Sequence, residues 1–365
     1  MAISEALPRR ADARAWSIGY FRPDGFVLAL VGVVVASTVL PCEGPSARVF
    51  GVLGTIAIAS LFFLQGARLS RDAIMNGLTH WRLHLVTAST TFIIFPSIGL
   101  AMKALFPMAL PPLPWMGVLF ACALPSTVQS SIALTSMAKG NVAGAVCSAT
   151  MSNLAGIFLT PLLFGLMSRL HGGAVDTQGI WHIILQLLVP FAAGHLLRPW
   201  IGAWAGRNRA VLSVTDRSSI LLVVYTAFSA AVVHGIWHQL PLRTLGILGV
   251  VMLLLLVSGL LVTILLSRTL ALCNADEVAI VFCGSQKSLV TGVPMANALF
   301  GAASIGTLLL PIMIYYPLQL IVCAWLARRY ATVPAVIPPS VGDEPSVAVE
   351  PATHAAPAWV SAPRR

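Results

Sequence analysis

Two short polar clusters interrupt long apolar stretches of this chain, and their residue types are those of a binding site. One cluster reads LPSTVQSS at 124–131, and the other reads FCGSQKS at 282–288. The second contains Lys287, which lies inside an apolar run from 278 to 300. A charge near the middle of a bilayer costs at least ~2.5–3.5 kcal/mol on the insertion scale. We therefore expect Lys287 to face a water-filled cavity, a partner group or a solute.

Each cluster also carries a residue that weakens a helix. Pro125 lacks a backbone donor, and Gly284 is conformationally free. An interrupted helix exposes N–H and C=O groups, which are tolerated in a membrane only inside protein or along a cavity. Its N-terminal ends attract anions and its C-terminal ends attract cations, while Ser, Thr and Gln oxygens suit a sodium ion or a polar solute. In the alternative interpretation, the hydroxyls only join neighbouring helices and Pro125 only kinks one.

The composition places these clusters in a membrane. The chain is 58% hydrophobic and 9% charged, with a mean hydropathy of +0.88, whereas soluble domains carry about 25% charged residues. Apolar runs long enough to cross a ~30 Å hydrocarbon core recur along the chain, and they lack the alternation of barrel strands. We predict an all-α polytopic protein with ten spans near 24–41, 49–67, 83–106, 114–136, 141–167, 181–203, 217–238, 244–267, 276–300 and 304–327.

The basic residues give this arrangement a direction. With ten spans, both termini lie on one side, which collects fifteen basic residues against four on the other side (Arg48, Lys103, Arg169 and Arg243). By the positive-inside rule, both termini are cytoplasmic, and we expect a multi-pass protein of a bacterial inner membrane. The net charge of +10 therefore needs no nucleic acid as partner. The fifteen are Arg9, Arg10, Arg14, Arg22, Arg68, Arg71, Arg82, Lys139, Arg198, Arg207, Arg209, Arg217, Arg268, Arg328 and Arg329.

The two clusters occupy corresponding spans of two halves. Residues 24–168 hold the first five spans and residues 181–328 hold the second five, and each cluster lies in the fourth span of its half. Since five is odd, the second half must be inserted upside down, as in the inverted repeats of secondary transporters. Residues 1–23 form a cytoplasmic N-terminal segment, and 333–365 are a disordered cytoplasmic tail by composition. No feature specifies an oligomeric state.

Cysteines and histidines add little to this interpretation. No cysteine–histidine spacing resembles a metal site. His195 lies on a predicted span and is best interpreted as a structural histidine.

The motifs resemble those of a known family. The 124–131 cluster, GNVA at 140–143, SNLAGIFLTP at 152–161, FFLQG at 62–66 and FCGSQKSL at 282–289 are similar to the sodium/bile acid cotransporter superfamily. They fit best its SBF-like branch, which includes solute carrier family 10 member 7 type proteins. The resemblance covers about residues 20–330. It implies two inverted five-helix repeats, with the first, second, sixth and seventh helices forming a panel domain. The others form a core domain, in which the broken fourth and ninth helices cross.

The resemblance also implies ligands. Ser130 and Ser131 match a sodium-binding pair, Gln286 matches a glutamine of a second sodium site, and Thr91 falls where relatives carry a glutamine ligand. Asn153 and the hydroxyls of Ser148, Thr150 and Ser152 are placed to line the first site. The complete set of expected solute- or ion-binding residues is Thr91, Ser126, Thr127, Gln129, Ser130, Ser131, Asn153, Ser285, Gln286, Lys287 and Ser288, with Ser130, Ser131 and Gln286 as sodium ligands.

Two departures from the family pattern concern the coupling ion. Phe282 falls where sodium-coupled relatives carry a glutamate, and Lys287 brings a positive charge to the crossing. An ammonium there could satisfy the oxygens that bind sodium, so either sodium or a proton could be the coupling ion. Lys287 would either hold the crossing together or pair with an anionic solute.

We therefore expect a secondary active transporter for a small, anionic organic solute, with no cofactor and no catalytic residues. Its site would lie at the crossing of the fourth and ninth spans. The first alternative is a non-transporting scaffold or regulatory protein with the same fold, although such a protein has little reason to keep a costly lysine. The second alternative is a membrane-embedded enzyme, but no nucleophile–base constellation supports it.

Overall fold

The computed structural model describes residues 25–68, 80–169, 177–233, 235, 241–300 and 302–332. The expected segments at 1–23 and 333–365 lie outside the described residues. All regular secondary structure in the described part is helical. The helices are α1 (Gly25–Val39), α2 (Gly44–Arg68), α4 (Trp81–Ser89), the π-helix η1 (Thr90–Ile94), α5 (Phe95–Leu105), α6 (Pro112–Ala123), α7 (Val128–Met137), α8 (Val142–Arg169), α9 (Thr177–Leu196), α10 (Arg198–Arg207), α11 (Arg209–Val233), α13 (Leu242–Thr269), α14 (Asn274–Ser285), α15 (Leu289–Leu299) and α16 (Ala302–Thr332).

Seven helical segments in the described part are long and apolar enough to cross a membrane, and the bent pair α6–α7 makes up to eight. The predicted spans at 24–41 and 181–203 correspond to shorter apolar helices. α1 has 15 residues, or about 22 Å at 1.5 Å per residue, which is less than the ~30 Å hydrocarbon core. The predicted span at 181–203 is divided between two helices, because α9 ends at Leu196 and the separate helix α10 follows. Length and composition therefore support a polytopic protein with fewer obvious spans than the ten predicted.

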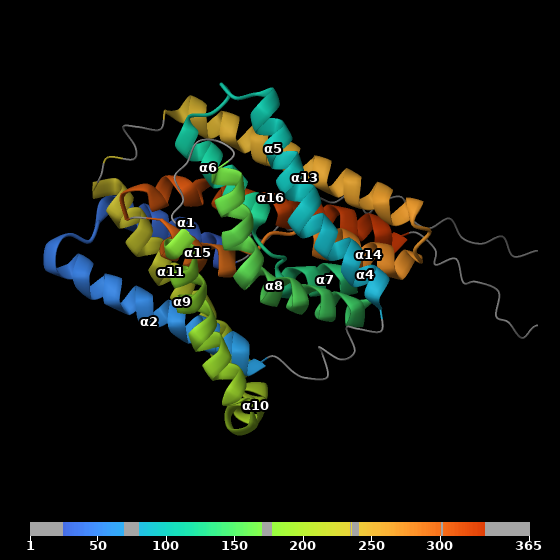
Figure 1. Cartoon of the computed structure of the whole chain (residues 1–365), viewed down its shortest axis with the longest axis horizontal. Helices are drawn as coiled ribbons and strands as arrows, with labels where there is room; N and C mark the ends of the chain where they lie inside the picture. Colours follow the sequence, from blue (N-terminus) through green and yellow to red (C-terminus); the bar gives the residue numbers. More distant parts are fainter. Residues whose placement is uncertain are drawn as a thin grey trace, which may run out of the picture. The chain divides into compact units, whose positions relative to one another are not determined.

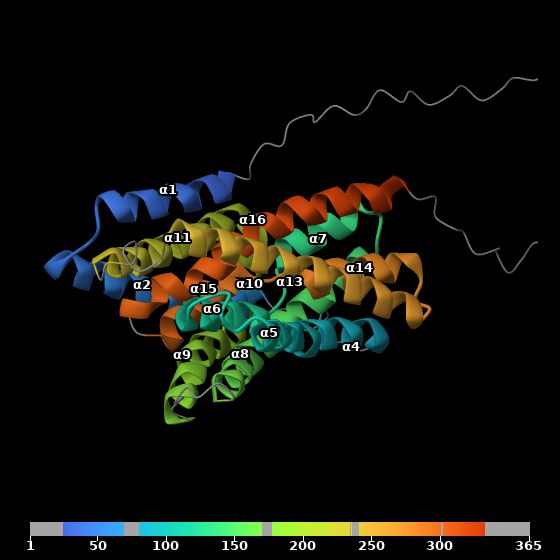
Figure 2. The same cartoon turned by 90° about the horizontal axis from the view of Figure 1, so that it is seen from above.

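The helices pack as two groups. α2 contacts α9 and α11, and α11 contacts α1, while α4, α6, α7, α8, α13, α14 and α16 make a second set of contacts, which α8 links to α9. The two views show α1, α2 and α11 at one end and α4, α7 and α14 at the other (Figures 1 and 2). α11 and α9 touch α15, and α11 touches α16. The two polar clusters thus lie in the larger group, with α15 and α16 bordering the smaller one.

Glycines allow the closest approach within the smaller group. A Cβ at Gly66 of α2 would lie 2.0 Å from the carbonyl oxygen of Phe191, and one at Gly194 of α9 would lie 1.9 Å from that of Phe63. Only glycine fits both positions, so α2 and α9 cross backbone against backbone. Such small-residue crossings are typical of membrane helices.

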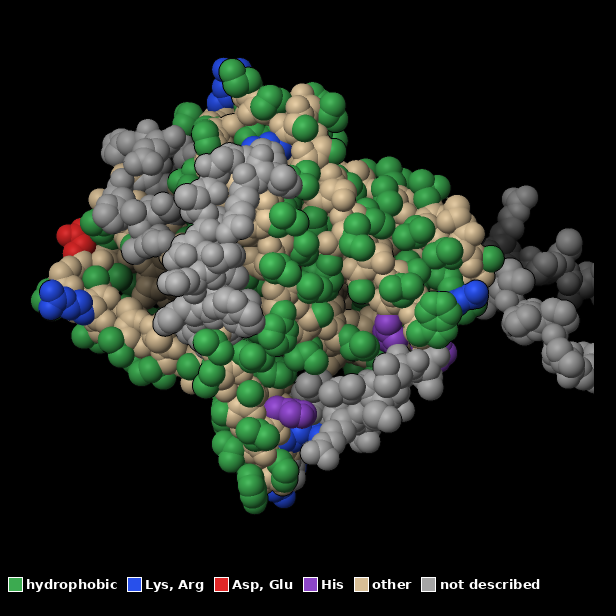
Figure 3. Space-filling view, viewed as in Figure 1, with side chains coloured by type: hydrophobic (Ala, Val, Ile, Leu, Met, Phe, Trp, Pro, Cys, Tyr) green, Lys and Arg blue, Asp and Glu red, His purple; other side chains and the backbone are tan. Residues whose placement is uncertain are grey.

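The outer surface of the described helices is apolar, and α13 is an example. Leu254, Leu261 and Leu265 of α13 are all exposed, and hydrophobic side chains are spread over the described part of the face drawn in Figure 3. Lys and Arg side chains lie mainly at the margins of that face. So many exposed large hydrophobic side chains mark contact with a non-aqueous partner, which for these long apolar helices is the lipid bilayer.

Candidate functional site at the crossing of two broken helices

Both predicted interruptions are present in the structure. α6 ends at Ala123 and α7 begins at Val128, with a bend of 60° between them. α14 ends at Ser285 and α15 begins at Leu289. The residues between them are extended, as at Leu124 (φ −69°, ψ 148°) and Gln286 (φ −81°, ψ 142°). Pro125 accounts for the first break because it cannot donate a helical hydrogen bond.

The two breaks are hydrogen-bonded to each other. The Ser288 N–H donates to the Pro125 carbonyl at 2.9 Å, and the Thr127 hydroxyl donates to the Lys287 carbonyl at 2.9 Å. The Ser130 hydroxyl donates to Oε1 of Gln286. Segments far apart in the sequence therefore form one crossing, in which each break supplies partners for the backbone groups that the other leaves free.

Lys287 lies inside this crossing, with an exposed fraction of 1%. Its Nζ donates to the carbonyl oxygens of Thr91 at 2.9 Å, Cys122 at 2.8 Å and Leu124 at 3.0 Å. It also lies 4.5 Å from the ring centroid of Phe95, a cation–π distance. Three acceptors match the three N–H bonds of an ammonium, so the surroundings suit the charged side chain.

The sequence explains why these carbonyls are available. In the π-helix η1, the Phe95 N–H bonds back to the Thr90 carbonyl, and the next residue, Pro96, has no N–H. The Thr91 carbonyl is thereby left for Lys287. Cys122 and Leu124 lie at the C-terminal end of α6, where the last carbonyls lack intrahelical donors. That end of a helix carries partial negative charge, so the ammonium lies where a cation is favoured.

Two side chains of α16 hold the second break in place. Gln319 accepts from the Lys287 N–H at 2.8 Å and donates to the Lys287 carbonyl at 3.0 Å. The Tyr315 hydroxyl donates to the Ser285 carbonyl at 2.8 Å. Neither residue was predicted, because a single Gln or Tyr in an apolar span carries no pattern that sets it apart.

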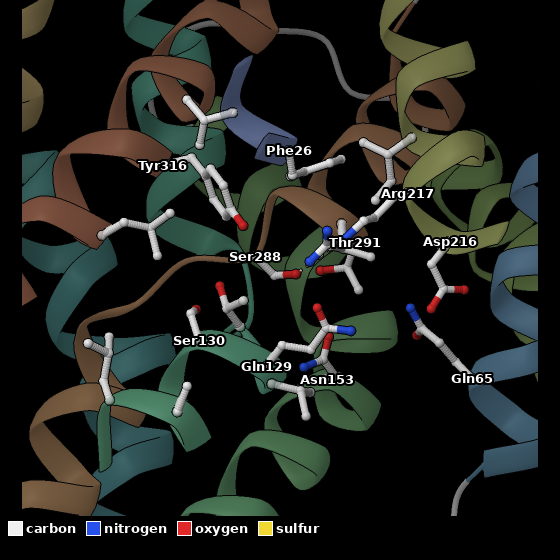
Figure 4. A pocket seen from close by; sticks show the side chains of 18 of the residues that line it. Phe26, Gln65, Gln129, Ser130, Asn153, Asp216, Arg217, Ser288, Thr291 and Tyr316 are labelled. Atoms are coloured by element: carbon white, nitrogen blue, oxygen red, sulfur yellow. Dashed lines mark hydrogen bonds between the residues drawn. The ribbon is translucent and has the colours of Figure 1, made fainter. Parts of the chain in front are cut away.

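A cavity of about 580 Å³ lies against one side of the crossing. Helices of both groups line it: α7, α8, α15 and α16 on the side of the crossing, and α1, α2, α9 and α11 opposite. Figure 4 shows Gln129, Ser130 and Asn153 on one side of it, and Gln65, Asp216 and Arg217 on the other. Its polar lining consists of Thr127, Gln129, Ser130, Thr150, Asn153, Ser288 and Thr291 on the crossing side, and Gln65, Arg68, Asp216 and Arg217 opposite.

The cavity contains more positive than negative charge. Arg68 and Asp216 form an ion pair at 2.6 Å, whereas Arg217 makes no ion pair with any described residue and lies over the Phe26 ring at 5.6 Å. The first turn of α7 also faces the cavity without a side-chain cap. Among the described residues, the buried Oδ1 of Asp216 and Oγ1 of Thr291 have no hydrogen-bond partner. Arg217 and the N-terminal turn of α7 suit a negatively charged group, whereas Oδ1 of Asp216 requires a hydrogen-bond donor on the same solute.

Five of the predicted site residues line the cavity: Thr127, Gln129, Ser130, Asn153 and Ser288. The other six lie outside its lining: Thr91, Ser126, Ser131, Ser285, Gln286 and Lys287. Several of them stabilise the crossing instead. The Ser131 hydroxyl donates to the Phe282 carbonyl at 3.1 Å, Ser126 is bonded to Ser152 and Asn153, and Thr91 contributes its carbonyl to Lys287.

The charged wall of the cavity was not predicted. From the sequence, Arg68 and Arg217 were interpreted only as residues that orient the chain, because the positive-inside rule explains basic residues at span ends. A usable signal was the adjacent pair Asp216–Arg217 at the start of an apolar span, since acidic residues contribute little to membrane orientation.

The chain matches the model of the SBF-like CPA transporter family over residues 24–332, and it belongs to that family. It is therefore a membrane transporter by class, and the resemblance read from the motifs is confirmed.

Three relatives show how far the similarity extends. "Putative symporter YfeH" of Escherichia coli (strain K12) is 51% identical over 307 residues, which are 84% of this chain and 92% of the relative. Sodium/bile acid cotransporter 7-B of Xenopus laevis is 27% identical over 313 residues (82% and 89%). Sodium/bile acid cotransporter 7 of Mus musculus is 28% identical over 305 residues (80% and 88%).

Proposed function

We propose that this protein is a secondary active transporter that carries a small, anionic organic solute by alternating access through the cavity beside the crossing. One observation carries the proposal: the cavity has one wall on the broken helices and the other on α1, α2, α9 and α11. Movement of one group against the other would open the cavity to either side of the membrane. Secondary transporters commonly bind their solutes where discontinuous helices meet.

The preference for an anion follows from three sources of positive potential. Arg217 brings a charge that no described carboxylate neutralises. The N-terminal turns of α7 and α15 both border the cavity, and helix N-termini favour negative ligands. The Arg68–Asp216 pair is neutral as a unit, so the lining keeps a net positive charge. The amides of Gln65, Gln129 and Asn153 would bind the polar parts of the solute.

The same proposal includes the architecture given by the motifs. The ten apolar segments would be ten spans in two inverted repeats, 24–168 and 181–328, with α1, α2, α9 and α11 as the panel domain. Both termini would face the cytoplasm of a bacterial inner membrane. Transport would be coupled to a cation. Two of the three relatives are named as sodium cotransporters, which favours sodium, and a proton is the other candidate.

Accessibility of the cavity from both sides of the membrane tests alternating access without knowledge of the solute. Gln129→Cys places a thiol on the cavity wall, and a membrane-impermeant maleimide is applied to right-side-out and to inverted vesicles. The wild-type chain, which has six cysteines of its own, gives the background labelling. We expect labelling above background from both sides. Labelling from one side under every condition would favour the alternative, a non-transporting scaffold with the same fold.

A further inference from the structure

We propose that the Lys287 ammonium is the resident cation of the crossing, held by carbonyl oxygens that would otherwise be available to sodium, so that this site takes no sodium ion. The inference deepens the proposed function, because it concerns the coupling ion of the same site. It rests on the ligand atoms around Lys287 and on the bonds made by the neighbouring polar side chains.

The coordination of the ammonium is complete. Its three N–H bonds meet three carbonyl oxygens at 2.8–3.0 Å, and the Phe95 ring lies over it. Backbone carbonyls at a helix C-terminus are also good ligands for a sodium ion, since they are hard oxygen donors at the negative end of the dipole. A tethered ammonium in this place satisfies the same oxygens, and unlike an ion it cannot leave.

The side chains that the family resemblance assigns to sodium already bond within the protein. The Ser130 hydroxyl is bonded to Oε1 of Gln286, and the Ser131 hydroxyl is bonded to the Phe282 carbonyl at 3.1 Å. These are the three side chains expected from the family resemblance to bind sodium. Since they bond to one another and to the backbone, they join α7 to α14 and to the second break, and they do not fit a sodium ion in this state.

No described carboxylate lies among the contacts of the ammonium. Asp216 pairs with Arg68, Asp276 accepts from Asn141, and Glu277 pairs with Arg268 and Tyr330. Within the described part of the chain, the positive charge at the crossing is therefore balanced by carbonyl dipoles and the Phe95 ring alone. A sodium ion entering beside it would meet a like charge in a region of low dielectric, where repulsion is strong.

The test compares thermal unfolding of the full-length chain in lipid nanodiscs in sodium, potassium and choline chloride at equal ionic strength. Four proteins are compared: the wild type, Lys287→Ala, Lys287→Met and the control Lys103→Ala on α5. We expect the Tm of the wild type and of the control to be the same in all three salts. Both Lys287 variants should lose several degrees in choline chloride, because three buried carbonyls lose their donor.

Sodium then distinguishes the two variants. Lys287→Ala leaves room among the carbonyls, so sodium should restore part of its lost Tm, whereas Lys287→Met fills the space and should not respond. A sodium-specific rise in the wild-type Tm would overturn the proposal, and this comparison remains valid if neither variant folds. A folded Lys287→Ala protein with no response to sodium would overturn the claim that the ammonium replaces that ion. Neither outcome depends on whether the protein transports a solute.

Discussion

Gln319 binds both backbone groups of Lys287: its Oε1 accepts from the Lys287 N–H at 2.8 Å, and its Nε2 donates to the Lys287 carbonyl at 3.0 Å. The side-chain amide thus acts as a neighbouring peptide group would in a sheet. Gln319 belongs to α16, which also packs against α6 and α7. The second break is therefore fixed by the rest of the core group, and the direction of the Lys287 side chain is fixed with it.

Removing this amide should weaken the fold. In Gln319→Leu the Lys287 N–H loses its partner, while the Lys287 carbonyl keeps the Thr127 hydroxyl. One buried donor left unsatisfied costs about 1–3 kcal/mol of unfolding free energy. The control is Gln65→Leu, because Gln65 makes no hydrogen bond to another described residue and lines the cavity. If thermal unfolding gave equal losses for the two variants, the assigned role of Gln319 would be wrong.

The ring above the ammonium gives a second stability prediction. A Cβ at Gly259 of α13 would lie 2.2 Å from Cζ of Phe95, so Gly259→Ala should displace the ring that covers Lys287. Overpacking of this kind costs about 1–3 kcal/mol. Gly249→Ala is a matched control on the same helix, since a Cβ there meets no atom within 4 Å. We expect it to be neutral or stabilising, as alanine is the better helix former, and the reverse order of the two Tm values would refute the packing argument.

Arg217 should determine the affinity for an anion. In Arg217→Gln the uptake efficiency for the transported anion should fall about 10- to 100-fold, the usual effect of losing a hydrogen bond to a charged group. Arg217→Lys should retain part of the activity. Arg207→Gln on α10 serves as the control, because Arg207 is exposed and does not line the cavity. Equal uptake by the wild type and Arg217→Gln would remove Arg217 from the site.

The orientation of the chain is tested with reporter fusions. A phosphatase that is active only in the periplasm should be inactive when fused after Arg329, because the basic residues place both termini in the cytoplasm. The same reporter fused after Pro107, between α5 and α6, should be active. Activity after Arg329 would mean that the number of spans before it is odd.

Much of the site was predictable from local chemistry. Pro125 removes a backbone donor at the first break, and conformationally free Gly284 lies in the last turn of α14, just before the second break. The positions of the breaks therefore follow from the sequence. The end of the first span was not predictable in the same way: the residues at 25–40 are mostly apolar, but α1 ends at Val39, because apolar composition alone does not fix where a helix stops.

The direction in which each side chain points was harder to predict from the sequence. Lys287 is adjacent in sequence to Ser288, which lines the cavity, yet the lysine lies outside that lining. In extended backbone, successive side chains point to opposite sides, so a shift of one residue decides which of the two meets the cavity. Asp216 and Arg217 take part in the cavity because α11 packs against α2. No local sequence pattern encodes such a contact between distant helices.

Uptake of labelled solutes into proteoliposomes is the most direct test of the central claim that this chain transports an organic anion through the cavity. A panel of small carboxylates, sulfonates and organic phosphates, each with an uncharged analogue, is offered to liposomes with and without the protein, under sodium and proton gradients in turn. We predict gradient-driven accumulation of at least one anion above the protein-free liposomes, and none of its uncharged analogue. Accumulation of no anion under either gradient, by protein that unfolds cooperatively, would contradict the claim and leave the scaffold interpretation.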